Sequence, residues 1–255
     1  MKLLSASRPG NAVRFDMRRP LGLAGLAGVI LLWQFVSSIL ASLLLPGPFT
    51  VAVRATALMF REDLLLDLGV TLIRVSVSVG LGFTVGVLLG VLCAHLHILH
   101  RLLDPLVQLL RPISPFAWTP LVILIFGLGN QPVVFTILVG VLPPALVIAF
   151  EAVRAINPDL RDIARIFGVS GWTLVSTVEL PLIRPELLAA ARVLFGVGWI
   201  LATGAEMLAA NSGLGYRLMN ARYLLDFPGL YALILVVGVT GLSLDRVLRV
   251  FGRTQ

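Results

Sequence analysis

Long apolar stretches alternate with short polar segments along this chain. A helix needs about 20 mostly apolar residues to cross the hydrocarbon core of a bilayer, and several stretches reach that length. About six of them can be placed, at roughly 21–41, 69–94, 104–126, 132–151, 185–210 and 229–248. The pattern therefore predicts an all-α membrane protein with about six transmembrane helices.

The polar segment between the fourth and fifth stretches, 152–184, carries the signals of a short helix. Asn157 can cap a helix whose first residue is Pro158, and Asp159 then lies in the first turn, where an acid is favourable. Gly168 can adopt the left-handed conformation that ends a helix. We therefore expect a helix that begins at Pro158 and stops at Gly168.

This short helix is predicted to be amphipathic. Apolar residues recur at the spacing of one helix face, at Leu160, Ile163, Ala164 and Phe167. The other face carries Arg161, Asp162 and Arg165. A stopped amphipathic helix between two spans favours a docking surface for another protein, and the alternative is a helix lying flat at the lipid interface.

The rest of the chain suggests one domain. The segment from Phe49 to Asp67 is too polar to span a membrane, so we expect an outer loop that contains an amphipathic helix. No tandem repeat or low-complexity linker divides the chain. The expected parts are a cytoplasmic N-terminal segment, a transmembrane domain and a cytoplasmic tail, at 1–20, 21–250 and 251–255.

Composition agrees with a polytopic membrane protein. Apolar residues make up 58% of the chain and charged residues 13%, whereas a soluble domain carries about a quarter charged residues. A net charge of +7 would suggest nucleic acid as the partner of a soluble chain. Here the arginines lie between apolar stretches, so we expect a lipid bilayer around the chain and no nucleic acid.

Cys93 is the only cysteine, which excludes a disulfide scaffold. The first apolar stretch lacks a convincing cleavage site, so it is interpreted as a retained span.

The basic residues predict the orientation. About six spans place both termini on one side, and with the N-terminus inside, fifteen of the 20 Lys and Arg residues fall in cytoplasmic segments. These are Lys2, Arg8, Arg14, Arg18, Arg19, Arg101, Arg111, Arg154, Arg161, Arg165, Arg184, Arg192, Arg246, Arg249 and Arg253. The outer five are Arg54, Arg61, Arg74, Arg217 and Arg222. This positive-inside bias places 152–184 in the cytoplasm.

Two ionisable residues lie inside apolar stretches, Arg74 and Glu206, at similar depths from the outer ends of their helices. Charges within membranes are rare and are usually paired or line a pore. We expect the guanidinium and the carboxylate to lie within about 4 Å of each other near the outer mouth. The alternatives are a solute contact by either residue, or a pair between Glu206 and Arg222.

Three glycines at intervals of four share one helix face, at Gly82, Gly86 and Gly90. Small residues in this arrangement let another helix approach closely, so we expect packing residues. Three histidines, His95, His97 and His100, raise the question of a metal site. His95 does not share a face with the other two, so we interpret them as interfacial residues and expect no metal and no cofactor.

Enzyme chemistry finds little support in the motifs. Lys2 is the only lysine, whereas a P-loop needs Gly-Lys-Ser/Thr to hold phosphates, so this chain cannot hydrolyse ATP by that route. The motifs H-E-x-x-H and G-x-S-x-G are also missing from the sequence. An intramembrane enzyme is therefore a weak alternative.

The segment from Asp162 to Pro181 resembles a known signature. It reads Asp162-Ile163-Ala164, three residues, Gly168, nine residues and Val178-Glu179-Leu180-Pro181. This is similar to the EAA signature of binding-protein-dependent ABC importers, which is Glu-Ala-Ala, three residues, Gly, nine residues and Ile-x-Leu-Pro. All three spacings hold, and the departures are Asp162, Ile163 and Val178.

Other runs resemble the nitrate, sulfonate and taurine permeases within those importers, and together they cover roughly 45–250. They are Leu45-Pro46-Gly47-Pro48, the run 101–105, Leu110-Arg111-Pro112, Pro120 with the run 126–129, Trp199, Ala205-Glu206-Met207 and the run 211–216.

The resemblance implies the type I importer permease fold, with 152–184 as a coupling loop. A coupling helix would contact an ATP-binding subunit through Asp159, Leu160, Arg161, Asp162, Ile163, Ala164, Arg165, Phe167 and Gly168. Asn157, Pro158 and Pro181 would mark helix ends.

The implied partners are two copies of the ATP-binding subunit, a second permease copy in a homodimer and an extracytoplasmic solute-binding protein. The implied location is the cytoplasmic membrane of a bacterium, with ATP hydrolysis in another polypeptide. The solute would be a small anion or zwitterion such as a sulfonate, taurine or nitrate. A permease of the methionine, phosphonate or pyrimidine-precursor branch is the alternative.

Overall fold

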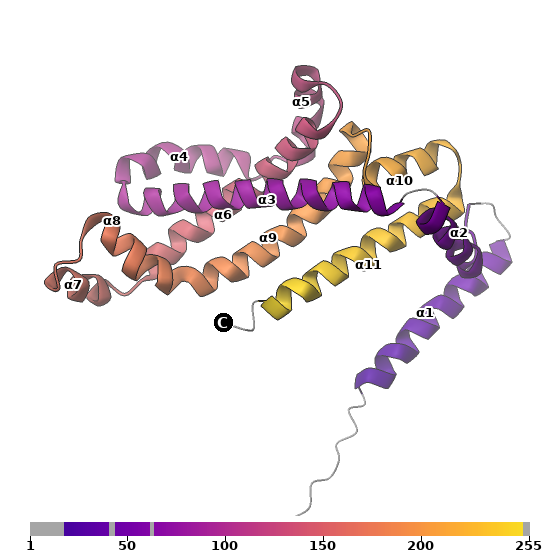
Figure 1. Ribbon diagram of the computed structural model, residues 1–255, viewed down its shortest axis with the longest axis horizontal. Helices are drawn as coiled ribbons and strands as arrows, with labels where there is room; N and C mark the ends of the chain where they lie inside the picture. The colour runs from indigo at the N-terminus through magenta and orange to yellow at the C-terminus, as the bar shows by residue number, and fades with distance from the viewer. Residues whose placement is uncertain (1–17, 41–43, 62–63, 252–255) are drawn as a thin grey trace, which may run out of the picture.

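The computed structural model describes residues 18–40, 44–61 and 64–251, and every regular element in these ranges is a helix (Figure 1). The helices are α1 (Arg18–Leu40), α2 (Pro48–Arg61), α3 (Leu64–His95), α4 (His97–Leu110), η1 (Pro115–Trp118), α5 (Thr119–Phe126), α6 (Asn130–Ala155), α7 (Pro158–Ile166), α8 (Gly171–Leu174), η2 (Val175–Glu179), α9 (Leu180–Ala209), α10 (Leu214–Tyr223) and α11 (Phe227–Phe251). Most of the N-terminal segment expected at 1–20 and of the tail expected at 251–255 lies outside the described residues.

Three long helices, α3, α6 and α9, pack together and form the centre of the molecule. Their facing side chains make the apolar core, with Val75, Ile137 and Ala202 fully buried. At about 1.5 Å per residue, the 32 residues of α3 extend for about 48 Å, which is longer than a hydrocarbon core. The ends of these helices therefore carry the polar clusters described below.

The spaced glycines of α3 face α6 at close range. A Cβ atom on Gly86 would lie 2.7 Å from both the Cβ atom of Ala145 and the carbonyl oxygen of Leu142. A Cβ atom on Gly90 would collide with the carbonyl oxygen of Leu146. At Gly82 the approach is looser, with contacts of 3.3 Å and more. The contact between α3 and α6 thus has no room for side chains at Gly86 and Gly90, as a packing role requires.

The long helices reproduce most of the expected spans. Four are apolar and long enough to cross a membrane: α3, α6, the continuous helix from Gly171 to Ala209, and α11. Helix α1 includes residues 21–40 of the first expected span at 21–41. The expected outer helix before α3 is also present, as α2.

The third expected span, 104–126, was wrong as a single straight helix. Helix α4 ends at Leu110, and the helical segment 115–126 leaves it at an angle of 91°. Two prolines, Pro112 and Pro115, lie in or beside the break. Proline lacks an amide hydrogen and disfavours helical geometry in the residue before it, so the chain turns here.

The second half of the expected loop 152–184 is helical, because one helix is continuous from Gly171 through Pro181 to Ala209. Pro181 lies in the first turn of α9. A π-helical turn, Val175–Glu179, lies directly before it. The ring of Pro181 would clash with a carbonyl in the preceding turn of a regular α-helix, and the wider π turn makes room for it.

The elements gather at two ends of the bundle (Figure 1). At one end, α7 and α8 lie beside the last residues of α3 and the first residues of α9; we name this the α7 end. At the other, α10 lies near the start of α3 and the end of α9; we name this the α10 end. Helix α10 was not foreseen, because its residues read as part of a polar loop.

Candidate functional site

Helix α7 has the start and stop that its sequence indicates. The side-chain oxygen of Asn157 accepts a hydrogen bond of 3.0 Å from the amide of Asp159, and Pro158 is the first helical residue. Gly168 has a φ of +79°, in the left-handed region. The amide of Val169 then donates to the carbonyl of Ala164 at 3.0 Å. These local contacts define a short, rigid helix between α6 and α8.

The apolar residues of α7 point away from the rest of the chain. Ile166 and Phe167 are 82% and 81% exposed, and Leu160 and Ile163 are about half exposed. Ala164 is buried, so the expected stripe is divided: one member packs inward, and Ile166, which the stripe did not include, lies outward. We name Leu160, Ile163, Ile166 and Phe167 the apolar patch. Exposed apolar residues clustered on one short helix are typical of a protein contact.

The charged residues of α7 have two different orientations. Arg165 pairs with Asp162 at 3.3 Å, and both side chains are largely exposed. Arg161 instead turns inward, where its Nε donates to Oε1 of Glu179 at 2.8 Å. Its Nη2 donates to the carbonyl of Val153, at the end of α6, at 2.5 Å. Arg161 therefore holds α7 against its own chain.

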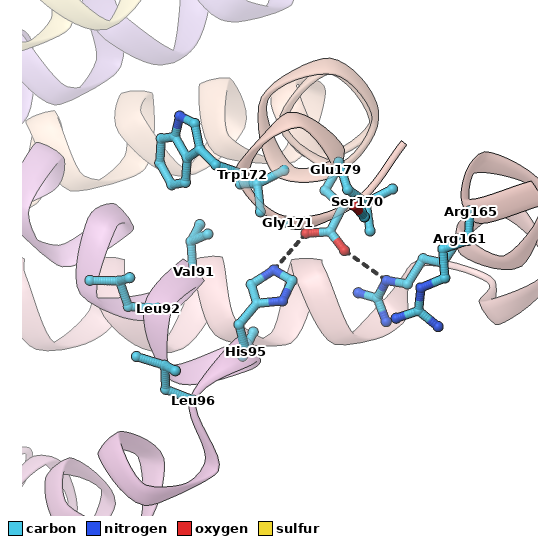
Figure 2. Close-up of a pocket in the computed structure, with 13 residues that line it drawn as sticks. Val91, Leu92, His95, Leu96, Arg161, Arg165, Ser170, Gly171, Trp172 and Glu179 are labelled. Carbon is cyan, nitrogen blue, oxygen red and sulfur yellow. Dashed lines mark hydrogen bonds and ion pairs between the residues drawn. The ribbon is translucent and has the colours of Figure 1, made fainter. Parts of the chain in front are cut away.

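Glu179 is the centre of this inward contact (Figure 2). Its carboxylate is buried and lies between two cationic or donor groups from different helices. Oε2 lies 2.7 Å from Nε2 of His95, the last residue of α3. We name His95, Arg161 and Glu179 the Glu179 cluster.

The Glu179 cluster borders a pocket of about 610 Å³ between the end of α3 and the α7–α8 segment (Figure 2). Leu92 lines it from α3, Leu96 from the junction between α3 and α4, and Trp172 from α8. Trp172 is 67% exposed, so this surface continues outward from the bundle. The α7 end thus combines an exposed apolar patch with an ion-paired base, which suits contact with another protein.

A second polar cluster lies at the α10 end and contains the pair expected from the sequence. Nη1 of Arg74 lies 2.7 Å from Oε1 of Glu206, within the expected 4 Å. The same guanidinium donates to Oδ1 of Asn130, at 2.9 Å from Nε, and to the carbonyl of Ser212, at 2.7 Å from Nη1. Arg222, the expected rival, donates to the sulfur of Met219.

The carboxylate of Glu206 also receives neutral donors. Thr71 donates to it at 3.0 Å, and the amide of Gly215 donates to Oε2 at 3.0 Å. Nearby, Asp67 accepts from the amide of Gly213 at 2.6 Å and pairs with Arg217. The loop between α9 and α10 is thereby fastened to the start of α3.

Several of these residues were missed by sequence reasoning. Glu179 is an acid among apolar residues, which is a usable signal, but its partner His95 was interpreted as interfacial. Asn130 and Ser212 carry no signal of their own, because short polar residues are common near helix ends.

The three histidines do not form one site. His95 contacts Glu179, whereas the ring of His100 stacks on Phe150 with centroids 4.3 Å apart. Within residues 18–40, 44–61 and 64–251, no cluster of His, Cys, Asp or Glu could hold a metal ion.

Comparison with known proteins identifies the family. Residues 86–254 match the model of the family described as binding-protein-dependent transport system inner membrane component. The chain belongs to this family. It is therefore an ABC importer permease, a multi-pass protein of the inner membrane.

Curated relatives match over most of their lengths. A putative aliphatic sulfonates transport permease of Bacillus subtilis is 28% identical, over 89% of this chain and 83% of its own. A nitrate import permease of Synechococcus elongatus is 30% identical, over 87% and 84%. A bicarbonate transport system permease of the same organism is 30% identical, over 95% and 92%.

Solved structures share the fold of this permease. The inward-facing MetNI methionine ABC transporter matches with a TM-score of 0.57 at 24% identity, over 71% of this chain and 92% of the matched chain. A bacterial alginate ABC transporter in complex with an alginate-bound periplasmic protein matches with a TM-score of 0.64 at 14% identity, over 94% and 95%. At these identities the likeness is one of fold, and this fold is that of the type I importer permeases.

Proposed function

We propose that α7 of this permease is the coupling helix on which a separate ATP-binding subunit docks. The observation that carries the proposal is the apolar patch. Ile166 and Phe167 are more than four-fifths exposed on a helix held by its own cap, its stop and Arg161. A patch that faces outward on a fixed base is suited to bury itself in a groove of a partner.

The proposed assembly has two permease chains, two ATP-binding subunits and an extracytoplasmic solute-binding protein. One chain supplies half of the translocation pathway and the permease pair is a homodimer. ATP hydrolysis belongs to the partner, because this chain has one lysine, Lys2, and no P-loop. Movement of the ATP-binding subunits would then displace α7 and switch the pathway between its inward- and outward-facing forms.

The proposed orientation places the α7 end and both termini in the cytoplasm. The bias of fifteen basic residues against five supports it. The single transmembrane domain would then extend through 21–250, with 152–184 on the cytoplasmic side and the α10 end facing the solute-binding protein.

The proposed solute is a small anion or zwitterion. Relatives are named for aliphatic sulfonates, nitrate and bicarbonate, which are all small anions of differing shape. Because these names differ at similar identity, they support the class of solute and no single member of it. Binding of sulfonates, taurine, nitrate and bicarbonate to the cognate solute-binding protein, measured by calorimetry, distinguishes them; a binding protein specific for a neutral or cationic solute contradicts the class.

The docking proposal is tested by substitution in the apolar patch. Ile166→Gln should reduce the amount of ATP-binding subunit that co-purifies with tagged permease, because it removes one of the two most exposed apolar side chains of the patch. The matched control is Ile98→Gln on α4, since Ile98 is 85% exposed and Ile166 is 82% exposed. Equal retention of the ATP-binding subunit by the two variants would contradict docking on α7.

A further inference from the structure

We infer that the Glu179 cluster is the linkage through which movement of α7 reaches the transmembrane bundle, with Glu179 and His95 as positioning residues. This inference rests on the proposed function of α7 as the docking helix. It adds a role for two residues that the docking surface does not include. In this proposal the apolar patch binds the ATP-binding subunit, and the Glu179 cluster passes the resulting movement of α7 to the transmembrane helices.

The Glu179 cluster connects α7 to the central helices of the bundle. Glu179 lies in the π turn that leads into α9, His95 is the last residue of α3, and Arg161 is on α7. One buried carboxylate therefore joins the docking helix to two of the three helices that form the central bundle. The second bond of Arg161, to the carbonyl of Val153 at 2.5 Å, adds the end of α6. Through the bonds of Arg161 and Glu179, α7 is joined to all three central helices.

The hydrogen bonds of Glu179 hold α7 in a fixed position relative to α3 and α9. The side chain of Glu179 is 1% exposed, and each of its oxygens has its own partner, at 2.8 Å and 2.7 Å. Charge-assisted hydrogen bonds to a buried carboxylate are short and directional, so they resist both rotation and sliding of α7. The exposed pair of Asp162 and Arg165, at 3.3 Å, joins two residues of α7 itself and offers no such path.

The backbone at Glu179 departs from regular α-helical geometry. Glu179 ends the π-helical turn, and Pro181 follows it within the same continuous helix. A π turn has weaker geometry than the α-helix around it and is a place where a helix can change its winding. A force applied to Glu179 by Arg161 therefore acts at a deformable point of the helix that continues into the bundle.

The experiment separates transmission from docking and from stability. Four variants are compared in proteoliposomes with the ATP-binding subunit and the solute-binding protein: Glu179→Gln, His95→Ala, His95→Gln and Asp245→Asn. His95→Gln keeps a side-chain donor near the position of Nε2, so it should rescue what His95→Ala loses. Asp245→Asn is the matched control, because Asp245 also lies between two cations, Arg192 and Arg249, away from α7.

Solute transported per ATP hydrolysed is the main measurement. We expect it to fall about tenfold in Glu179→Gln and His95→Ala, within the range of coupling between distant sites. The amount of bound ATP-binding subunit should stay within about twofold of the wild type, as it should in the control. An unchanged transport-to-ATP ratio in His95→Ala, or the same loss in His95→Gln, overturns the inference. If Glu179→Gln does not accumulate in the membrane, the two His95 variants decide the question.

A second measurement needs no partner and so distinguishes failure of the linkage from failure of the docking proposal. Nitroxide labels at cysteines replacing Asp159 on α7 and Ile98 on α4, in a Cys93→Ala background, report the distance between α7 and the bundle. We expect the distance distribution to broaden in His95→Ala and to stay narrow in His95→Gln and Asp245→Asn. A distribution that is equally narrow in all variants overturns the linkage, whatever binds α7.

Discussion

The guanidinium of Arg74 and the carboxylate of Glu206 lie 2.7 Å apart, although 132 positions separate them in the sequence. Their side chains are 6% and 0% exposed, so the pair is removed from water on all sides. Thr71, Asn130 and the loop after α9 supply further hydrogen bonds to the pair. The pair fixes the end of α9 against the start of α3.

Removing one partner of this pair should therefore be costly. Arg74→Ala and Glu206→Ala should each destabilise the permease by about 3–5 kcal/mol, because each leaves a buried charge without its partner. The double variant should be milder than the sum, with a coupling energy of about 0.5–3 kcal/mol. Thermal unfolding of the purified protein in detergent measures these differences. Strictly additive losses would contradict a direct energetic coupling of the two side chains.

Gly213 should be intolerant of any side chain. Its φ is +103°, and a Cβ atom would lie 2.6 Å from Cδ of Glu206. Gly213→Ala should therefore destabilise the α10 end by about 1–3 kcal/mol, as overpacking does, and thermal unfolding in detergent checks this. The control is Gly80→Ala on α3, where nothing lies within 4 Å and a methyl group should be tolerated. Equal melting temperatures for both variants would count against this account of the loop.

The effect of a substitution at Gly168 should depend on whether the new residue tolerates a left-handed backbone, and not on the size of its side chain. Its φ is +79° and nothing lies within 4 Å of a Cβ atom, so only the left-handed geometry opposes a side chain. Gly168→Val should strain the end of α7 by about 1–2 kcal/mol or more and reduce transport while the chain still inserts. Gly168→Asn should keep more activity, because asparagine tolerates this region. Normal solute-stimulated ATPase activity in Gly168→Val would contradict a requirement for the stop.

The orientation of α7 is accessible to labelling. In a Cys93→Ala background, a cysteine replacing the exposed Arg165 on α7 should react with an impermeant thiol reagent only from the cytoplasmic side. A cysteine replacing Phe60 on α2, where the side chain is 82% exposed, should react only from the opposite side. The reverse pattern would remove the basis for a contact between α7 and an ATPase. The outer position at Glu62 lies outside the described residues, so Phe60 is the better site.

The sequence by itself determined the features that depend on neighbouring residues. Asn157, Pro158 and Gly168 define α7 because capping and left-handed stops act within a few positions. The glycines of α3 share a face for the same local reason. The pair of Arg74 and Glu206 was also accessible, because an unpaired charge within a membrane is so costly that two at the same depth predict each other.

Tertiary structure decided the contacts that depend on how helices cross. Whether Arg161 faces a partner or its own chain follows from the rotation of α7 against α6 and α9, which no periodicity specifies. His95 meets Glu179 across 84 positions because α3 and α9 pack with one particular register. The bend after Leu110 and the π turn before Pro181 likewise reflect how proline is accommodated in a given environment. Local chemistry gives a helix its ends and faces, but only close packing determines which face meets which neighbour.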